Sequence, residues 1–288
     1  MKKVLLAGAT GALGIELLKL LHQQNYEIRA LVRNLGKAEQ VRPYCSEVWI
    51  GDATDRSAIA GACQGIDIVV SAMGKSISLF TNSAASFHDV DFQANANLLD
   101  EAIASGVGRF VYVSIFGSET SPKLRVGWSH EMFAQKLMQT PLSYTILKPV
   151  GIFTGLHDLI IMGRKGLLVT PGNGQPVTNP IHQQDLARVC AQVLEAGPPV
   201  MEVGGPEIHS RNEVARSVAQ HTGARTINLP RGLVLMGLLM VRLASRNLYD
   251  KLSYFTYITT HDMVAPPYGE QSFDAYLQEP PLTYRSRA

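Results

Sequence analysis

The chain has 288 residues, of which 46% are hydrophobic and 17% are charged, and its formal net charge is +2. This composition is typical of a folded globular protein and excludes a disordered chain. The basic residues form no run of five or more, so the charge pattern predicts no nucleic-acid partner.

The three cysteines, Cys45, Cys63 and Cys190, lie far apart and form no Cys-x-x-Cys pair. They are expected to be small buried thiols, which fits a reducing, cytoplasmic location. The eight histidines show no ligand spacing such as His-Glu-x-x-His, so no metal is expected.

The first predicted element is a buried strand over residues 3–7, followed by three spaced glycines and a helix over 12–24. Gly8 permits a tight turn, Gly11 lets the backbone approach a pyrophosphate, and Gly14 lets the helix pack on the strand. A secretory signal peptide also begins with lysines and an apolar run, but it has no need for glycines at three-residue intervals. We therefore predict a loop that binds a nicotinamide dinucleotide, with contacts from Gly8, Thr10, Gly11, Ala12, Leu13 and Gly14.

The second predicted strand, over 28–32, ends at Arg33, which lies 19 residues after Gly14. At this place an acidic residue would accept hydrogen bonds from the ribose 2′-hydroxyl of NAD. Arginine instead offers a forked donor that matches a 2′-phosphate, so we predict NADP(H) as the cofactor. The alternative is that Arg33 is a solvated loop residue.

The rest of the first half continues to alternate short β-branched runs with helical patterns. This alternation predicts an α/β fold, a Rossmann-type doubly wound parallel sheet with helices on both faces. Further strands are expected at 47–50, 66–71, 109–114 and 144–148, and further helices at 55–63, 86–105 and 129–139.

After residue 150 the alternation loosens, which predicts a nucleotide-binding domain over 1–150 and a smaller, partly interleaved substrate-binding region over 151–288. Residues 163–180 are rich in Gly, Pro and Asn and are expected to form loops that contact substrate. Helices are predicted near 183–196 and 211–222, with a strand at 201–203.

An apolar helix is predicted near Leu233. Its run of nine apolar residues up to Val241 is too short to span a bilayer, which needs about 20 residues. A core helix or a subunit interface is the plainer interpretation, and peripheral membrane contact stays open.

Several motifs occur in an order that resembles the atypical or extended short-chain dehydrogenase/reductases, near the NmrA-like and NAD(P)H-binding epimerase-like group. They are GATGALG, ALVRN, GDATD, GVGRFVYVS, YTILKP, NPIH and DLA, and they cover most of residues 1–195. The resemblance implies that Asp52 and Ala53 border the adenine, that Ser71, Ala72 and Met73 lie along the cofactor, and that Ser114 lies beside the nicotinamide. Asp52 could instead only cap the following helix, and Ser71 could be a small core residue.

The family's usual proton donor is a tyrosine with a lysine four residues later on the helix before the sixth strand. Here that helix contains no tyrosine. Tyr144 and Lys148 have the right spacing, but in a strand they are roughly 13 Å apart rather than the about 5 to 6 Å of one helical turn. Ser114 and His130 are the candidate catalytic residues that remain, with Lys75, Lys123 and Lys148 as weaker alternatives.

Two functions are consistent with these observations. The first is an NAD(P)-dependent oxidoreductase that transfers hydride from NADPH to a small carbonyl, enone or quinone. The second is a non-enzymatic NADP(H)-sensing regulatory or assembly factor, which the missing tyrosine and lysine would suit. The substrate is not specified by the sequence, and an oligomer stays open.

Overall fold

The computed structural model describes residues 2–81, 83–121 and 123–280. These residues form two compact units. The first unit comprises the chain up to Lys75 together with Ala85–Pro149 and Gln183–Val203, and the second comprises Ser76–Ala84, Val150–His182 and the chain from Gly204 onward. The domain boundary expected at residue 150 stays a prediction.

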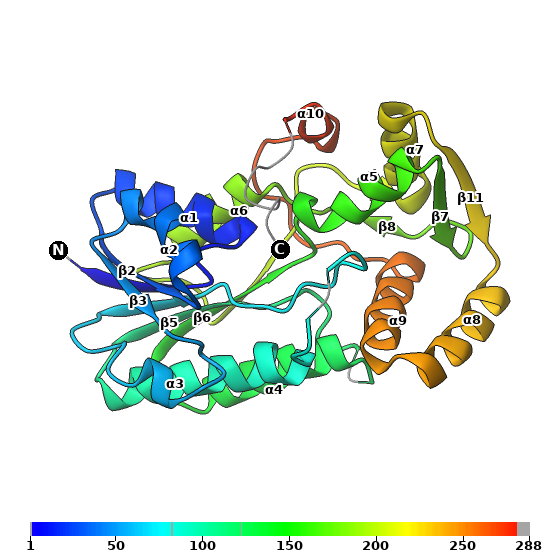
Figure 1. Ribbon diagram of the computed structural model, residues 1–288. Helices are drawn as coiled ribbons and strands as arrows, with labels where there is room; N and C mark the ends of the chain where they lie inside the picture. The colour runs from blue at the N-terminus through cyan, green and yellow to red at the C-terminus, as the bar shows by residue number, and fades with distance from the viewer. Residues whose placement is uncertain (1, 82, 122, 281–288) are drawn as a thin grey trace. The chain divides into compact units, whose positions relative to one another are not determined.

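The first unit is built on a seven-stranded sheet in the order β3-β2-β1-β4-β5-β6-β9, and every neighbouring pair is parallel. Helices α1 and α6 lie on one face of the sheet, and α3 and α4 lie on the other (Figure 1). This arrangement confirms the predicted Rossmann-type fold. The strands are β1 Lys3–Ala7, β2 Glu27–Val32, β3 Glu47–Ile50, β4 Ile68–Ser71, β5 Arg109–Val113, β6 Ser143–Pro149 and β9 Val200–Val203.

Most helices of the first unit fall where the sequence pattern predicts them. The α-helices are α1 Ala12–Gln23, α2 Leu35–Val41, α3 Asn95–Ala104, α4 Arg125–Met138 and α6 Gln183–Gln192. Short 3-10 helices, η1 Arg42–Tyr44 and η2 Ser57–Ile59, and one π-helix, η3 His88–Ala94, complete the unit.

The prediction of a helix at 55–63 is wrong, because only the short 3-10 helix η2 forms there. Side chains in this segment compete for the backbone: Asp52 accepts hydrogen bonds from the amide and hydroxyl of Thr54, and Asp55 does the same for Ser57. Such local bonds favour turns over a helix. Gly61 then adopts a φ of +84°, which ends any helical path.

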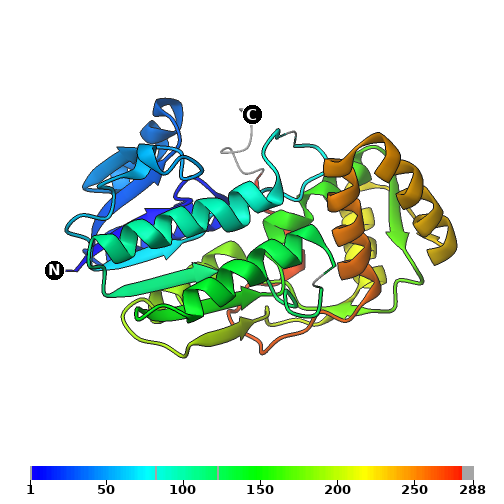
Figure 2. The same ribbon diagram turned by 90° about the horizontal axis from the view of Figure 1, so that it is seen from below.

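The second unit combines short strands with five α-helices in its described residues. Figure 2 shows α8 and α9 side by side within it. Its elements are η4 Phe153–Leu156, α5 His157–Arg164, β7 Leu167–Pro171, β8 Val177–Thr178, β10 His209–Ser210, α7 Arg211–Thr222, β11 Arg225–Leu229, α8 Arg231–Ala244, α9 Arg246–Thr260 and α10 Phe273–Leu277.

The expectation of loops throughout 163–180 is also wrong, since β7 and β8 lie in this range. Strand β7 pairs in parallel with β11, and β8 pairs with β10. Both partner strands are more than 30 residues further along the chain, so a local pattern of Gly, Pro and Asn cannot predict the strand pairing.

Arg109, the first residue of β5, ties the sheet to the chain that follows α6. The residue is only 6% exposed, and its guanidinium donates to the carbonyl oxygens of Leu194 and Val193 at 2.9 and 2.8 Å. It also donates to the hydroxyls of Ser143 and Thr145 at 2.8 and 2.6 Å. Desolvation lowers the pKa of Arg109, and four oxygen acceptors compensate the buried charge.

Replacing Arg109 with methionine is expected to lower the free energy of unfolding by about 3 kcal/mol, because four acceptors, three of them buried, lose their donor. Urea denaturation of the two proteins measures the difference. Arg56→Met is the control, since the Arg56 side chain is 74% exposed and its loss should cost less than about 0.5 kcal/mol. Equal stability of Arg109→Met and the unmodified chain would contradict this account.

Candidate functional site

The residues predicted to contact the cofactor follow the carboxyl ends of adjacent parallel strands. Gly8 follows β1, Arg33 follows β2, Asp52 follows β3 and Ser114 follows β5, while Ser71 ends β4. The register pairs Ala7 of β1 with Leu31 of β2 and with Ser71 of β4, so these strand ends are level. Since β1 and β4 flank the place where the strand order reverses, the residues gather where ligands bind in this class of fold.

The glycine loop has a geometry that side chains would obstruct. Gly8 has a φ of +82°, and a Cβ atom there would lie 2.5 Å from the carbonyl oxygen of Ala72. A Cβ atom at Gly14 would lie 2.0 Å from the carbonyl oxygen of Gly8. The structure therefore gives physical reasons for glycine at both positions.

Helix α1 begins directly after this loop. Its N-cap is Gly11, and no side chain caps the helix. The backbone amides of Ala12, Leu13 and Gly14 therefore occupy the first turn, where amides have no partner within the helix. Leu13 points its side chain into the core and is 7% exposed, so only its amide is offered to a ligand. This is a cradle that fits the pyrophosphate of a dinucleotide.

Arg33 and Asp52 differ in their availability. Arg33 is exposed and makes no hydrogen bond or ion pair within the described part of the chain, so its guanidinium is free for a ligand. Asp52 is half-buried, and one of its oxygens is occupied by Thr54. Ala53 beside it is buried, and its carbonyl oxygen accepts a hydrogen bond from Asn97 at 2.8 Å.

The end of β4 is held by buried polar contacts. Ser71 is fully buried, and its hydroxyl donates to Oδ1 of Asn95 at 2.5 Å. The amide of Ala72 donates to the carbonyl oxygen of Ala7 at 3.0 Å, which continues the β1–β4 pairing by one residue. Met73 lies partly buried against the core. Ser71 therefore has a structural task in addition to the predicted one.

A buried polar cluster lies beside the strand ends of the first unit. The hydroxyl of Tyr112, on β5, shares a hydrogen bond of 2.6 Å with Nδ1 of His130, on α4. Nε2 of His130 lies 3.7 Å from Oδ2 of Asp91, on η3. The other Asp91 oxygen accepts a hydrogen bond of 2.6 Å from the amide of Lys75. We call Asp91, His130 and Tyr112 the buried triad.

Burial drives the members of the buried triad toward their neutral forms. It raises the pKa of Asp91 to about 8 and lowers the pKa of His130 to about 4. Burial, with a smaller contribution from the Asp91 charge, raises the pKa of Tyr112 well above its ordinary value. At pH 7 all three groups are therefore mainly uncharged.

Ser114 lies two residues beyond Tyr112 and is 3% exposed. Its hydroxyl lies near enough to the Tyr112 phenol to lower that group's pKa slightly, but no hydrogen bond of acceptable geometry reaches its oxygen within the described residues. Its amide donates to the carbonyl oxygen of Leu147 at 2.7 Å, which fixes the backbone. A buried hydroxyl without a partner is costly, and a ligand that accepted a hydrogen bond from it would remove that cost.

The alternative lysines are less suited to catalysis. The Lys148 amine lies 2.7 Å from a Glu119 oxygen and 3.5 Å from a Glu131 oxygen. Residues 143–149 form a strand, which confirms that Tyr144 and Lys148 do not share a helical turn. Lys75 lies over the ring of Phe87 at 4.5 Å, and Lys123 is exposed in a turn before α4.

The sequence predicted roles for His130 and Ser114 but none for Asp91 and Tyr112, which the structure places beside His130. The sequence pattern places Tyr112 in a strand and Asp91 in a helix, and it indicates no contact between them. The available signal was an acid on an otherwise buried face of the segment 86–105, because a buried carboxyl requires a polar partner.

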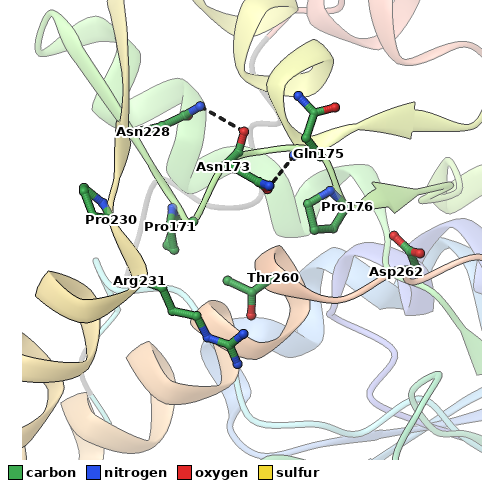
Figure 3. Close-up of a pocket in the computed structure, with 10 residues that line it drawn as sticks. Pro171, Asn173, Gln175, Pro176, Asn228, Pro230, Arg231, Thr260 and Asp262 are labelled. Atoms are coloured by element: carbon green, nitrogen blue, oxygen red, sulfur yellow. Dashed lines mark hydrogen bonds between the residues drawn. The ribbon is translucent and has the colours of Figure 1, made fainter.

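The second unit has a hollow of its own, with a volume of about 880 Å³ (Figure 3). Pro171, Asn173, Gln175 and Pro176 line it, and all four belong to the segment expected to contact substrate. The carbonyl oxygen of Asn173 accepts a hydrogen bond of 3.1 Å from the Asn228 side chain, which joins this segment to β11. The substrate contact itself stays a prediction.

Two further expectations concern absent features. In residues 2–81, 83–121 and 123–280, no three His, Cys, Asp or Glu side chains are grouped so that they could hold a metal ion. Over the same ranges, every helix is too short or too polar to cross a bilayer.

Comparison with known proteins identifies the cofactor class. The sequence profile of a family described as NAD(P)H-binding matches residues 8–197, more than half of the chain. The photosystem II assembly factor Ycf39 of Synechocystis sp. is 27% identical over 196 residues, which are 67% of this chain and 58% of that protein. An NAD(P)H azoreductase of Xenophilus azovorans is 26% identical over 232 residues, which are 76% of this chain and 74% of that protein.

The matched region spans only about half of the length of the first Ycf39 relatives, 46% and 58%. Among solved structures, an NADPH-dependent quinone oxidoreductase of Escherichia coli in complex with NADPH has a TM-score of 0.75 and 20% identity. That alignment covers 95% of this chain and 98% of the other. At this identity the likeness shows the fold.

The buried triad predicts a pH-dependent stability. The folded pKa of Asp91, about 8, exceeds its ordinary value of 3.8, so the stability it contributes at low pH is lost as the pH rises toward 8. We expect the stability of the unmodified chain to fall relative to Asp91→Asn between pH 6.5 and 8, by up to about 1.4 kcal/mol per pH unit. Urea denaturation at several pH values measures this.

Between pH 6.5 and 8 the effect of Asp91 on stability can be separated from that of its neighbour His130. The pKa of His130 in the folded chain is lowered to about 4 from 6.5. The stability that neutral His130 contributes is therefore fully present above pH 6.5 and is lost only as the pH falls below that value. The control is Asp274→Asn, at an exposed position of α10, for which the stability difference should not vary with pH. If the stability difference between Asp91→Asn and the unmodified chain stayed constant between pH 6.5 and 8, the account of Asp91 as a neutral carboxyl would be refuted.

Proposed function

This chain belongs to the NAD(P)H-binding family, and on that basis we propose that it is an NADPH-dependent reductase acting on a small carbonyl, enone or quinone. The observation that carries the proposal is the unpartnered, buried hydroxyl of Ser114. This residue follows β5 at the edge of the sheet where the strands end, and the glycine loop lies at the same edge. Relatives named as an NAD(P)H azoreductase and a quinone oxidoreductase support a reductase. A cytoplasmic location stays a prediction.

The residues present fit a dinucleotide. Gly8 and Gly14 leave room that a Cβ atom would fill, and the first turn of α1 presents uncapped amides to a pyrophosphate. The bound cofactor would supply the hydride. Asp52, Ala53, Ser71, Ala72 and Met73 are proposed to line its path along the strand ends.

We assign Ser114 as the residue that donates a hydrogen bond to the oxygen of the substrate. A preorganised donor in a water-poor site stabilises the charge that develops on that oxygen during reduction. His130 and Tyr112 do not act as the direct proton donor, because one is neutral with a depressed pKa and the other has a raised one. They are positioning residues that hold the end of β5, and the proton would come from solvent.

The choice of NADPH over NADH is proposed to depend on Arg33. Its free guanidinium can pair with a 2′-phosphate, whereas an aspartate there would repel it. We expect Arg33→Asp to lower the ratio of NADPH affinity to NADH affinity by about tenfold or more. Fluorescence titration with both nucleotides measures the ratio. Arg216→Asp makes the same charge change at an exposed position of α7, and an effect of equal size there would refute the assignment.

Turnover tests the reductase. The full chain is incubated with NADPH and a panel of quinones, enones and carbonyls, and oxidation of NADPH is followed by absorbance. Ser114→Ala should lower kcat/KM by about 10- to 100-fold with little change in NADPH affinity. Ser129→Ala is the matched control, because Ser129 is also buried with an unpartnered hydroxyl. Tight binding without turnover of any substrate would reject the reductase.

A second candidate function rests on the relatives named as photosystem II assembly factors. In this function the nucleotide site would regulate contact with another protein without a reaction. Such coupling requires that the nucleotide bind two conformations with different affinity. Absence of turnover, combined with a change in hydrogen exchange of the second unit when NADPH binds, would favour it.

A further inference from the structure

Helix α8, Arg231–Ala244, is the one α-helix of at least ten residues with no buried residue in the described part of the chain. It carries more exposed large apolar side chains than any other helix described. Leu233, Leu235, Met236, Leu239, Met240 and Leu243 are between 50% and 85% exposed. A surface helix of a soluble protein normally turns polar residues outward.

The exposed residues form a continuous face. Val234, Leu238 and Val241 are spaced four and three apart and are half-exposed, which marks the stripe that packs against α9. Met236, Met240 and Leu243 lie on the opposite side of the helix, at the same spacing. The face that points away from the protein is therefore apolar, and we call it the α8 face.

The stretch of sequence that contains the α8 face carries only positive charge. Between Glu213 and Asp250 the sequence contains no aspartate or glutamate. Five arginines lie in this interval, and every one of them is exposed: Arg216, Arg225, Arg231, Arg242 and Arg246. Arg231 begins α8 and also lines the hollow in Figure 3. An apolar face bordered by arginines matches the chemistry of an anionic lipid surface.

A second copy of the chain is the less favourable occupant. Two α8 helices packed face to face about a two-fold axis would run parallel or antiparallel. The parallel arrangement brings each arginine of α8 near the same arginine of the other copy, and the antiparallel arrangement brings Arg231 of each copy near Arg242 of the other. Like charges at such an interface would repel. A lipid surface with negative headgroups instead pairs each arginine while it covers the apolar side chains.

We propose that α8 is an interfacial anchor that lies in the plane of an anionic membrane surface and inserts Leu233, Met236, Leu239, Met240 and Leu243 below the headgroups. The helix does not cross the bilayer, because 14 residues are too few. The anchor is independent of the proposed reductase, and either can fail without the other.

Flotation of the full chain with vesicles tests the anchor. We expect binding to vesicles of phosphatidylcholine and phosphatidylglycerol in equal parts, and much weaker binding to phosphatidylcholine alone. Met240→Glu combined with Leu243→Glu should weaken binding by about tenfold or more. Gln in place of Arg231, Arg242 and Arg246 should cost about fivefold for each arginine at low salt.

The matched control is Ile103→Glu combined with Ile208→Glu, which adds the same charge at exposed apolar positions outside α8. Because all four side chains are exposed, the variants should keep the fold, and circular dichroism and NADPH binding check this. Equal binding of both double variants, or no binding of the unmodified chain, would overturn the proposal. Conversion of a dimer to a monomer by the α8 substitutions, without any vesicle binding, would identify a second copy as the occupant and also overturn it.

Discussion

The close approach of Gly8 to the end of β4 fixes the geometry of the nucleotide site. With the carbonyl oxygen of Ala72 only 2.5 Å from the place of a Cβ atom, the chain leaves β1 along a path that only glycine can take. Gly14 then packs against the carbonyl oxygen of Gly8, which sets the start of α1. Because β1 lies between β2 and β4, this turn stands at the reversal of strand order, and the flanking strand ends are level with it.

Burial determines the protonation states of the neighbouring buried triad, and with them its chemistry. The usual proton donor of the short-chain dehydrogenase/reductases is a phenol whose pKa is lowered by a lysine. Here the only phenol in the triad, Tyr112, has its pKa moved in the opposite direction, and its partner is a neutral imidazole. The one lysine on a neighbouring strand, Lys148, is held by Glu119 and Glu131. The triad is thus a neutral cluster in which Tyr112 and His130 share a hydrogen bond, in place of a charged catalytic pair, and Ser114 is the residue proposed to meet a substrate.

Local patterns predicted the nucleotide-binding half of the fold well. The strand and helix periods of β1, α1, β2 and β5 repeat within a few residues, so each element is visible without knowledge of its neighbours. The glycine positions were predictable for the same reason, since the turn is built from adjacent residues. Whether Arg33 and the strand-end residues bind the cofactor stays a prediction, because the structure gives their positions and not their ligand.

The remaining elements depend on partners that are distant in sequence. β7 is a strand because β11 pairs with it, and the triad forms because a π-helix, a strand and α4 each contribute one side chain. No spacing rule joins Asp91, Tyr112 and His130. The segment 55–63 fails as a helix because aspartate side chains capture the backbone amides, which is a contest between local bonds that a hydrophobic pattern does not register.

Helix α8, in contrast, could be predicted from its own residues without a distant partner, because it is apolar on every side. An all-apolar helix normally indicates burial in a core, yet α9 covers only one stripe of this one. Short helices gain most of their stability from packing an apolar face, so a helix with six large apolar side chains facing water lacks the contacts that would fix it. The absence of acidic residues from Val214 to Tyr249 adds a constraint that a protein core does not require. Both features are accounted for together when the missing contact is a surface that is apolar inside and negative outside.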